Sequence, residues 1–320
     1  MIAAGRARKS PKHKDSEANL RRAAIAFAEQ ARAFHDVAMQ MRGASAALPL
    51  YYCALNLAKA ELLIAGEISI GARQTHGLSH SQETASQLRS DRVAIKPAGV
   101  FASLFRLRLG HSTGVLGSAH VRLDALLARM GEIDAETALV DLPGREGLTV
   151  GMRFCAGAGR VGVHIDIGNH PAWLDSRTRS ATEFKNSMVA EFHPVNKPSL
   201  PFALESLQDW SNEEDAARGV ARVLARYGSV VGATIIFRPC LPIKDVTSKG
   251  VATRKLLALP DHMARYMFIY TVSSIVRYVP ERIDACGDRP LRAIVDLAVD
   301  EACTCIVLDS ALHMCRFQLQ

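Results

Sequence analysis

The sequence predicts a mainly helical α+β protein, in which the N- and C-terminal segments form a helical bundle and a smaller strand-containing α+β unit is inserted between them. Two observations carry this prediction. Apolar residues recur at helical spacing over residues 16–65 and again over residues 251–320. Between them, residues 148–240 alternate as strands do and are broken by glycines. The length of 320 residues is enough for two domains.

Two consecutive helices begin the predicted bundle. Ser16 is placed to cap a helix that continues to Gly43, with its apolar residues along one stripe. A second helix is expected from Ala46 to Ala65, with Pro49 in its first turn, where a missing amide hydrogen costs nothing. Because apolar residues surround this second helix almost completely, we expect it to be central and largely buried.

A short hairpin and a short helix complete the predicted helical domain, residues 16–131. Residues 92–110 predict two short strands that turn through residues 96–99, KPAG. Ser118 is then in position to cap a short helix over residues 121–133, which ends near Gly131.

The inserted α+β unit is expected over residues 148–240. The segment 148–168 alternates around a glycine-rich turn and predicts a β-hairpin. Asn212 or Ser211 would cap a helix over residues 213–228, and the β-branched run 229–237 predicts a strand.

Two more helices are expected in the C-terminal segment, residues 251–320. Pro260 and Asp261 begin the first, and Pro280 ends it. The second runs from Arg289 to Met314. Both are expected to pack back on the N-terminal helices, which would bring the two ends of the chain into one bundle.

Charge favours polyanionic partners. With 39 Lys and Arg against 32 Asp and Glu, the formal net charge is +7 and the sequence pI is about 9.1. Part of the excess lies in residues 1–15, which lack apolar periodicity and predict a disordered basic arm. Such an arm either stays solvated as a tail or contacts nucleic-acid phosphates. Its candidate phosphate-binding residues are Arg6, Arg8, Lys9, Lys12 and Lys14.

The chain is expected to be cytoplasmic, without a membrane partner. We find no apolar run of the ~18–20 residues that a membrane-spanning helix needs and no secretory signal near the N-terminus. The 7 cysteines are odd in number and scattered, as reduced intracellular thiols are. Cys303 and Cys305 would point to opposite sides of one helix, so we expect no metal site with His313 and Cys315, and no cofactor.

The second predicted helix carries an unusual polar stripe. Tyr52, Asn56 and Lys59 fall on one face, beside an apolar face that includes Tyr51. A buried amide or ammonium needs a partner, because leaving one unpaired costs about 1–3 kcal/mol or more. Two interpretations stay open: a structural network that fixes helix packing, or the wall of a site that faces an anion or a partner protein.

Two other stretches carry candidate functional residues. His76 and His80 lie four residues apart in a glycine-containing loop, and imidazole suits proton transfer as well as metal binding. The structural alternative is that a histidine here bonds to the preceding helix. Arg277 and Tyr278 end a mostly apolar helix, where the arginine either complements the helix dipole or reaches a phosphate.

Several of these stretches together resemble the YaaC-like proteins of bacteria. The segments are YYCALNLAKA with HGLSH downstream, VAIKPAGVF, LDALLARMGEI and LPDHMARYMFIYTVSSIVRYVPERI, and they occur in the same order. They cover both ends of the chain, whereas residues 148–239 offer little to compare. The resemblance implies the family and carries no established activity with it.

The N-terminal helices are also similar to HEPN-type modules, which pair as dimers and include RNA-cleaving toxins and defence effectors. Those modules use an arginine and a histidine that are separated by four to six residues, a spacing that Arg73 with His80 and Arg8 with His13 also fit. Arg106 with His111 fits that spacing. The similarity implies that a histidine would act on the ribose 2′-hydroxyl while an arginine stabilises the phosphate. The candidate catalytic residues are His76, His80, Arg106 and His111.

These observations lead to competing hypotheses about function. The first is a HEPN-like, RNA- or nucleotide-directed effector, in its narrowest form a metal-independent ribonuclease in bacterial stress or phage defence. The second is a non-catalytic adaptor or assembly subunit that binds a protein encoded nearby. A small-molecule sensor is a third class. RNA or another nucleic acid, a neighbouring protein and further copies of the chain are the expected partners, and Tyr52, Asn56, Lys59, Arg277 and Tyr278 are the candidate ligand- or partner-binding residues.

Overall fold

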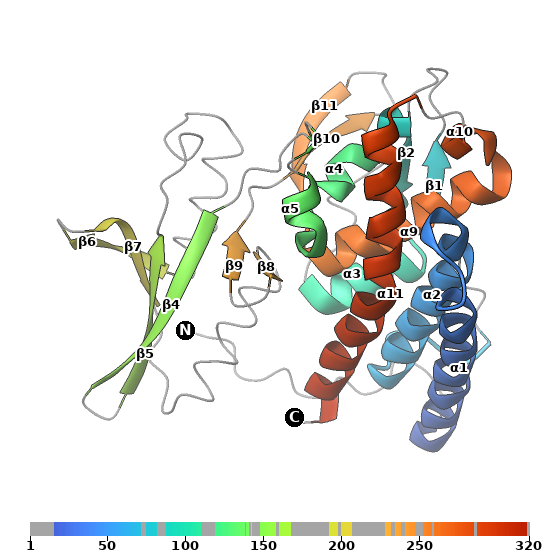
Figure 1. Ribbon diagram of the computed structural model, residues 1–320. Coiled ribbons are helices and arrows are strands. Elements are labelled where there is room, and N and C mark those ends of the chain that lie inside the picture. The colour runs from blue at the N-terminus through green and yellow to red at the C-terminus, as the bar shows by residue number, and fades with distance from the viewer. Residues whose placement is uncertain are drawn as a thin grey trace. The chain divides into compact units, whose positions relative to one another are not determined.

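The chain divides into two compact units, each described here by itself (Figure 1). The first contains the described residues up to Leu123, residues 245–246 and those from Tyr266 on. The second contains those from Asp124 to Lys244 and from Ala252 to Arg265, so it begins within the predicted 16–131 domain. The computed structural model describes residues 16–71, 75–81, 88–109, 119–137, 139–140, 142, 148–157, 160–167, 192–197, 200–206, 228–231, 234–237, 241–246, 252–257, 259–284 and 287–318.

Helices from both ends of the chain build the first unit, which confirms the predicted mainly helical α+β class. Ser16 caps the first helix, accepting a hydrogen bond from the Asn19 backbone N–H at 3.3 Å. The helices are α1 (Glu17–Ala38), α2 (Ala47–Ile64), α3 (Val100–Leu109), α9 (Asp261–Tyr278, from Tyr266 on), α10 (Glu281–Asp284) and α11 (Arg289–Gln318), with the short 3₁₀ helices η1 (Gly43–Ala46) and η2 (Leu88–Ser90).

Helix α2 is the centre of the first unit, as its apolar sequence predicts. Both α1 and α11 pack against it (Figure 1). Leu50 and Leu62, near its two ends, are fully buried. Of the residues described, those from Gly43 to Ile64 form a helix that is long and apolar enough to cross a membrane by length and composition, contrary to the prediction that the chain has no such run. However, 78% of that window is buried inside the protein, as in a core helix.

The start of α2 is fastened to α11 through η1. The backbone N–H groups of Gly43 and Ala44 donate to the carboxylates of Asp300 and Asp296, at 2.8 and 2.7 Å respectively. Gly43 has a φ of 56°, and a Cβ added there would lie 2.5 Å from an oxygen of Asp296. Only glycine therefore fits this approach of the two ends of the chain.

A small antiparallel sheet lies in the first unit. Its strands β1 (Leu78–Ser81), β2 (Arg92–Ile95) and β3 (Ala119–Arg122) are paired in the order β1-β2-β3. Leu78 pairs with Ile95, and Val93 pairs with Val121. These inward-facing residues are almost completely buried, so the sheet presents one face to the core.

The predicted hairpin over residues 92–110 is wrong in its second half. Residues 92–95 form β2, but residues 100–109 form α3 rather than a returning strand. Val100, Phe101, Leu104 and Phe105 are buried together, at helical spacing. A short apolar run does not distinguish strand from helix by periodicity alone, and here the partners of β2 are β1 and β3.

The helix predicted over residues 121–133 is also divided. Residues 119–122 form β3, and only then do α4 (Leu123–Leu127), the 3₁₀ helix η4 (Gly131–Ile133) and α5 (Asp134–Thr137) follow. The first residues of the predicted helix, 121 and 122, therefore belong to a strand that pairs with β2. Ser118, its expected cap, lies outside the described residues.

The second unit contains the predicted β-hairpin over residues 148–168. Strands β4 and β5 pair antiparallel from Val150 with Ile167 to Gly157 with Arg160. The described strands of this sheet are ordered β6-β7-β5-β4-β9-β8. The predicted helix 213–228 falls almost entirely outside the described residues. The strands are β4 (Leu148–Gly157), β5 (Arg160–Ile167), β6 (Phe192–Lys197), β7 (Leu200–Ser206), β8 (Gly228–Val231) and β9 (Thr234–Phe237); β10 (Leu241–Val246) and β11 (Ala252–Leu257) follow in the chain.

Candidate anion-binding site

His76 is the centre of a candidate site in the first unit. Its Nδ1 lies 2.6 Å from the hydroxyl oxygen of Tyr51 on α2. Tyr270 on α9 packs edge-on against Tyr51, with ring centroids 5.1 Å apart, and lies 6.3 Å from the imidazole of His76. His76 itself is solvent-exposed, whereas Tyr51 is buried. An exposed imidazole is thus supported from beneath by two tyrosines of two helices.

Backbone contacts between two turns hold His76 in place. The carbonyl of His76 accepts from the backbone N–H of Phe101 at 3.1 Å, and that of Thr75 accepts from Val100 at 2.9 Å. These donors are the first N–H groups of α3, which have no partner within their own helix. The N–H of Lys96 donates to the carbonyl of Gly77 at 2.9 Å. The turn before β1 is therefore fixed on the turn between β2 and α3.

The site is electropositive. Partial burial lowers the pKa of His76, and the positive charges of Lys59, Arg277 and Lys96 lower it further. These three cations come from α2, α9 and the turn after β2. Within the described part of the chain, no salt bridge joins any of them to a carboxylate. The imidazole therefore has three cationic neighbours, none of which forms a salt bridge with a described carboxylate.

The predicted polar stripe of α2 divides between the core and the site. Tyr52 stacks on Phe34 of α1, with ring centroids 5.2 Å apart. Asn56 is 5% exposed and so lies in the interior. Only Lys59 contributes to the electropositive site; its ammonium lies 5.2 Å from the ring centroid of Phe27, and burial lowers its pKa. Tyr52 and Asn56 therefore pack against other parts of the protein, whereas Lys59 is one of the cations that act on His76.

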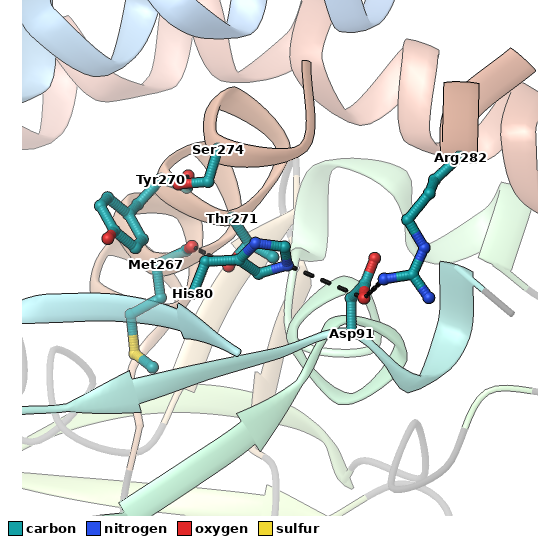
Figure 2. Close-up of polar contacts among 7 residues, drawn as sticks. All are labelled: His80, Asp91, Met267, Tyr270, Thr271, Ser274 and Arg282. Carbon is teal, nitrogen blue, oxygen red and sulfur yellow. Dashed lines mark hydrogen bonds and ion pairs between the residues drawn. The ribbon is translucent and has the colours of Figure 1, made fainter. Parts of the chain in front are cut away.

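His80 belongs to a different, buried cluster, shown in Figure 2. Its Nε2 lies 3.7 Å from a carboxylate oxygen of Asp91, and the guanidinium of Arg282 pairs with the same oxygen. Asp91 is fully buried, and the side chain of His80 is 8% exposed. Figure 2 shows these groups beside residues of α9, including Tyr270, whose hydroxyl donates to the carbonyl of Leu78 at 3.2 Å. The cluster fastens α10 and the strand β1 to the loop before β2.

Arg106, another predicted catalytic residue, does not join His76. Arg106 lies on α3, not on a strand, and pairs with Glu67 at 3.1 Å. His111 lies outside the described residues, as do the five basic residues of the N-terminal arm, Arg6, Arg8, Lys9, Lys12 and Lys14. Of the predicted ligand-binding residues, Arg277 contributes charge at His76, and its guanidinium lies 5.1 Å from the ring centroid of the exposed Tyr278.

Sequence reasoning missed three residues of the site. Tyr51 was assigned to the apolar face of its helix, and burial does raise the pKa of its hydroxyl, followed in effect by Tyr266 and Tyr270. Tyr270 lies in an apolar helix without a distinguishing pattern. Lys96 was placed in the turn of a hairpin. Of these three residues, only Lys96 carries a sequence feature that favours a place at an anion site, namely a positive charge in a Lys-Pro turn.

Fold and site together define a mainly helical α+β protein with an exposed, basic site at the junction of two helices and two turns. The chain belongs to the YaaC-like protein family, which matches residues 4–289. The match includes residues 148–239, where motifs in the sequence offered little to compare. Neither curated proteins nor solved structures gave a match to the chain.

Proposed function

We propose that this protein is an RNA- or nucleotide-directed effector that binds a phosphate group at the site around His76. The observation that carries the proposal is that the positive charges of Lys59, Arg277 and Lys96 all act on an exposed imidazole, while no described carboxylate forms a salt bridge with them. Uncompensated cations gathered from separate elements repel one another, and a bound anion would relieve this repulsion.

The chemistry of the surrounding groups favours phosphate attached to a base. The planar guanidinium of Arg277 suits phosphate oxygens, and the ammonium groups supply point charges. Tyr278, next in the chain, is 65% exposed. Cations beside exposed aromatic rings are the common means of binding single-stranded nucleic acids, whose bases stack on the rings. A ribonuclease activity at this site would use His76 as its proton-transfer group, with Arg277 near the phosphate.

The test is binding of a short single-stranded RNA to the full chain, measured by fluorescence anisotropy over a series of salt concentrations. A triple variant, Lys59→Ala with Lys96→Ala and Arg277→Ala, should bind more weakly. The plot of log affinity against log salt concentration has a negative slope, and this slope should become shallower by at least about 0.7 in the variant. That is the value for one lost phosphate contact on a single strand. Cleavage of the same RNA without added metal, compared between wild type and His76→Ala, tests the narrower ribonuclease proposal.

A matched control separates the site from general charge. Arg21, Arg22 and Arg32 are exposed cations of α1. Replacing all three by alanine removes the same charge and leaves the N-terminal arm unchanged. This variant should retain most of the affinity and salt slope. Equal losses in the two triple variants would contradict the proposal and leave the adaptor role as the hypothesis to pursue.

A further inference from the structure

Tyr51 determines how the hydrogen bond to His76 is made. Its hydroxyl is buried, with the side chain 4% exposed, and lies against Tyr266 and Tyr270 at ring-centroid distances of 6.0 and 5.1 Å. Burial strongly disfavours the phenolate, so the oxygen keeps its proton. A protonated hydroxyl 2.6 Å from Nδ1 can donate to that nitrogen when the imidazole is neutral, and burial together with the surrounding cations lowers the pKa of the imidazole and so disfavours a second proton.

With Tyr51 as the donor, the hydrogen bond selects one tautomer of His76. When Nδ1 accepts, the single proton of a neutral imidazole must be on Nε2. Among the described residues, the charged and titratable groups that act on the ring are Tyr51 and Lys59 from α2, Tyr270 and Arg277 from α9, and Lys96 from the turn after β2. These groups provide positive charge or hydroxyls. None of them is a carboxylate that would accept the Nε2 proton.

We propose that Tyr51 is a positioning residue that holds His76 as the Nε2–H tautomer, so that His76 donates a hydrogen bond to a bound oxyanion and takes up one proton as the anion binds. This rests on the proposed function, because the oxyanion is the phosphate group of that ligand. A free inorganic oxyanion and the phosphate group of a nucleotide are both tetrahedral oxyanions, so the site would recognise either one.

The proton balance follows from electrostatics. In the free protein, three cations and partial burial keep His76 neutral near pH 7. A bound anion supplies the missing negative charge and raises the pKa of the imidazole. At a pH between the pKa values of the free and bound states, a proton from solvent is added to Nδ1. Tyr51 then changes from donor to acceptor, since the protonated ring has two N–H groups. No covalent bond forms or breaks.

The sign of the pH dependence is therefore defined. The bound state holds more protons than the free state, so affinity increases as pH falls through the range between the two pKa values. The limit for one proton is about tenfold per pH unit. Sulfate is the probe of choice because it stays dianionic over this range, whereas a phosphate monoester titrates near pH 6. Inorganic phosphate and a mononucleotide then show which source of the oxyanion is preferred.

The experiment combines calorimetry and NMR on the full chain. Sulfate titrations in buffers of different ionisation enthalpy count the protons taken up, and ¹⁵N shifts of the histidine rings report the tautomer. Wild type should show a protonated Nε2 and an affinity that increases at lower pH. Tyr51→Phe should weaken sulfate binding about two- to tenfold at pH 7.5, the worth of one hydrogen bond, and less at low pH, where both ring nitrogens carry protons.

Controls separate this inference from the proposed function. Tyr52→Phe, on the neighbouring tyrosine that stacks on Phe34, should change neither readout. His76→Ala should abolish the proton uptake and leave residual binding by the cations. Sulfate binding without proton uptake, or an Nδ1–H tautomer in the free protein, would overturn the inference while RNA binding could persist. If replacing Lys59, Lys96 and Arg277 by alanine leaves the RNA affinity unchanged, the proposed function is overturned, whichever tautomer His76 has.

Discussion

Replacing Glu61 by glutamine is expected to lower the free energy of unfolding by about 3–5 kcal/mol, because it leaves the guanidinium of Arg108 buried without its counter-ion. Glu61 on α2 is fully buried, and the side chain of Arg108 on α3 is 5% exposed. Two parallel hydrogen bonds join them, at 3.1 and 2.6 Å. Urea unfolding, followed by circular dichroism, measures the change.

A second ion pair that involves α3 is a matched control. Glu67 follows α2 and pairs with Arg106 of α3 at 3.1 Å, but the side chain of Arg106 is 48% exposed. Glu67→Gln should therefore change the stability by only about 0–1 kcal/mol. The double variant Glu61→Leu with Arg108→Leu should recover much of the loss, since apolar replacement of a whole buried pair is often neutral. If Glu61→Gln and Glu67→Gln change the free energy of unfolding equally, burial of the Glu61–Arg108 pair is not the reason for the loss.

Gly99→Ala is expected to have the second large effect, a loss of about 2–6 kcal/mol in the free energy of unfolding. Gly99 has a φ of 117°, and an added Cβ would lie 2.5 Å from the backbone nitrogen of Gly77. Strain of this kind costs about 1–3 kcal/mol, and overpacking costs about 1–3 kcal/mol more. Because the contact is between two backbones, no side chain can rotate away to relieve it.

The same substitution should also disturb the candidate site. Gly77 follows His76 directly, so moving its backbone displaces the imidazole from the hydroxyl of Tyr51. Sulfate and RNA affinity should fall in those Gly99→Ala molecules that remain folded. Gly71→Ala is the control, because its φ is 75° but nothing lies within 4 Å of an added Cβ. It should cost about 1–2 kcal/mol of strain and leave binding unchanged. Similar losses from both substitutions would contradict the role of close backbone approach.

The sequence determined those parts of this protein whose causes are local. Ser16 caps α1, Pro49 fits the first turn of α2, and Pro280 follows the end of α9, and each helix was predicted from such signals. The glycine-rich turn likewise predicted the hairpin of β4 and β5. Helical period, caps and tight turns depend on residues within a few positions of one another, so they are readable from one stretch of chain.

The tertiary structure alone decided where the short apolar segment 100–109 went and which polar residues meet. Residues 100–109 form α3, and β2 pairs instead with β1 and with β3, which lies further along the chain. Lys59 and Arg277 were recognisable as polar groups in apolar helices, but their joint effect on His76 arises from packing of α2, α9 and two turns. The role of Tyr51 could not be predicted from the sequence. A buried tyrosine that only fills the core and one that bonds a histidine look alike in sequence, and they differ only in the hydrogen-bond partner of the hydroxyl. Contacts between segments far apart in the chain are not marked by any helical period or cap in the sequence. The contacts that build the candidate site around His76 are of this kind.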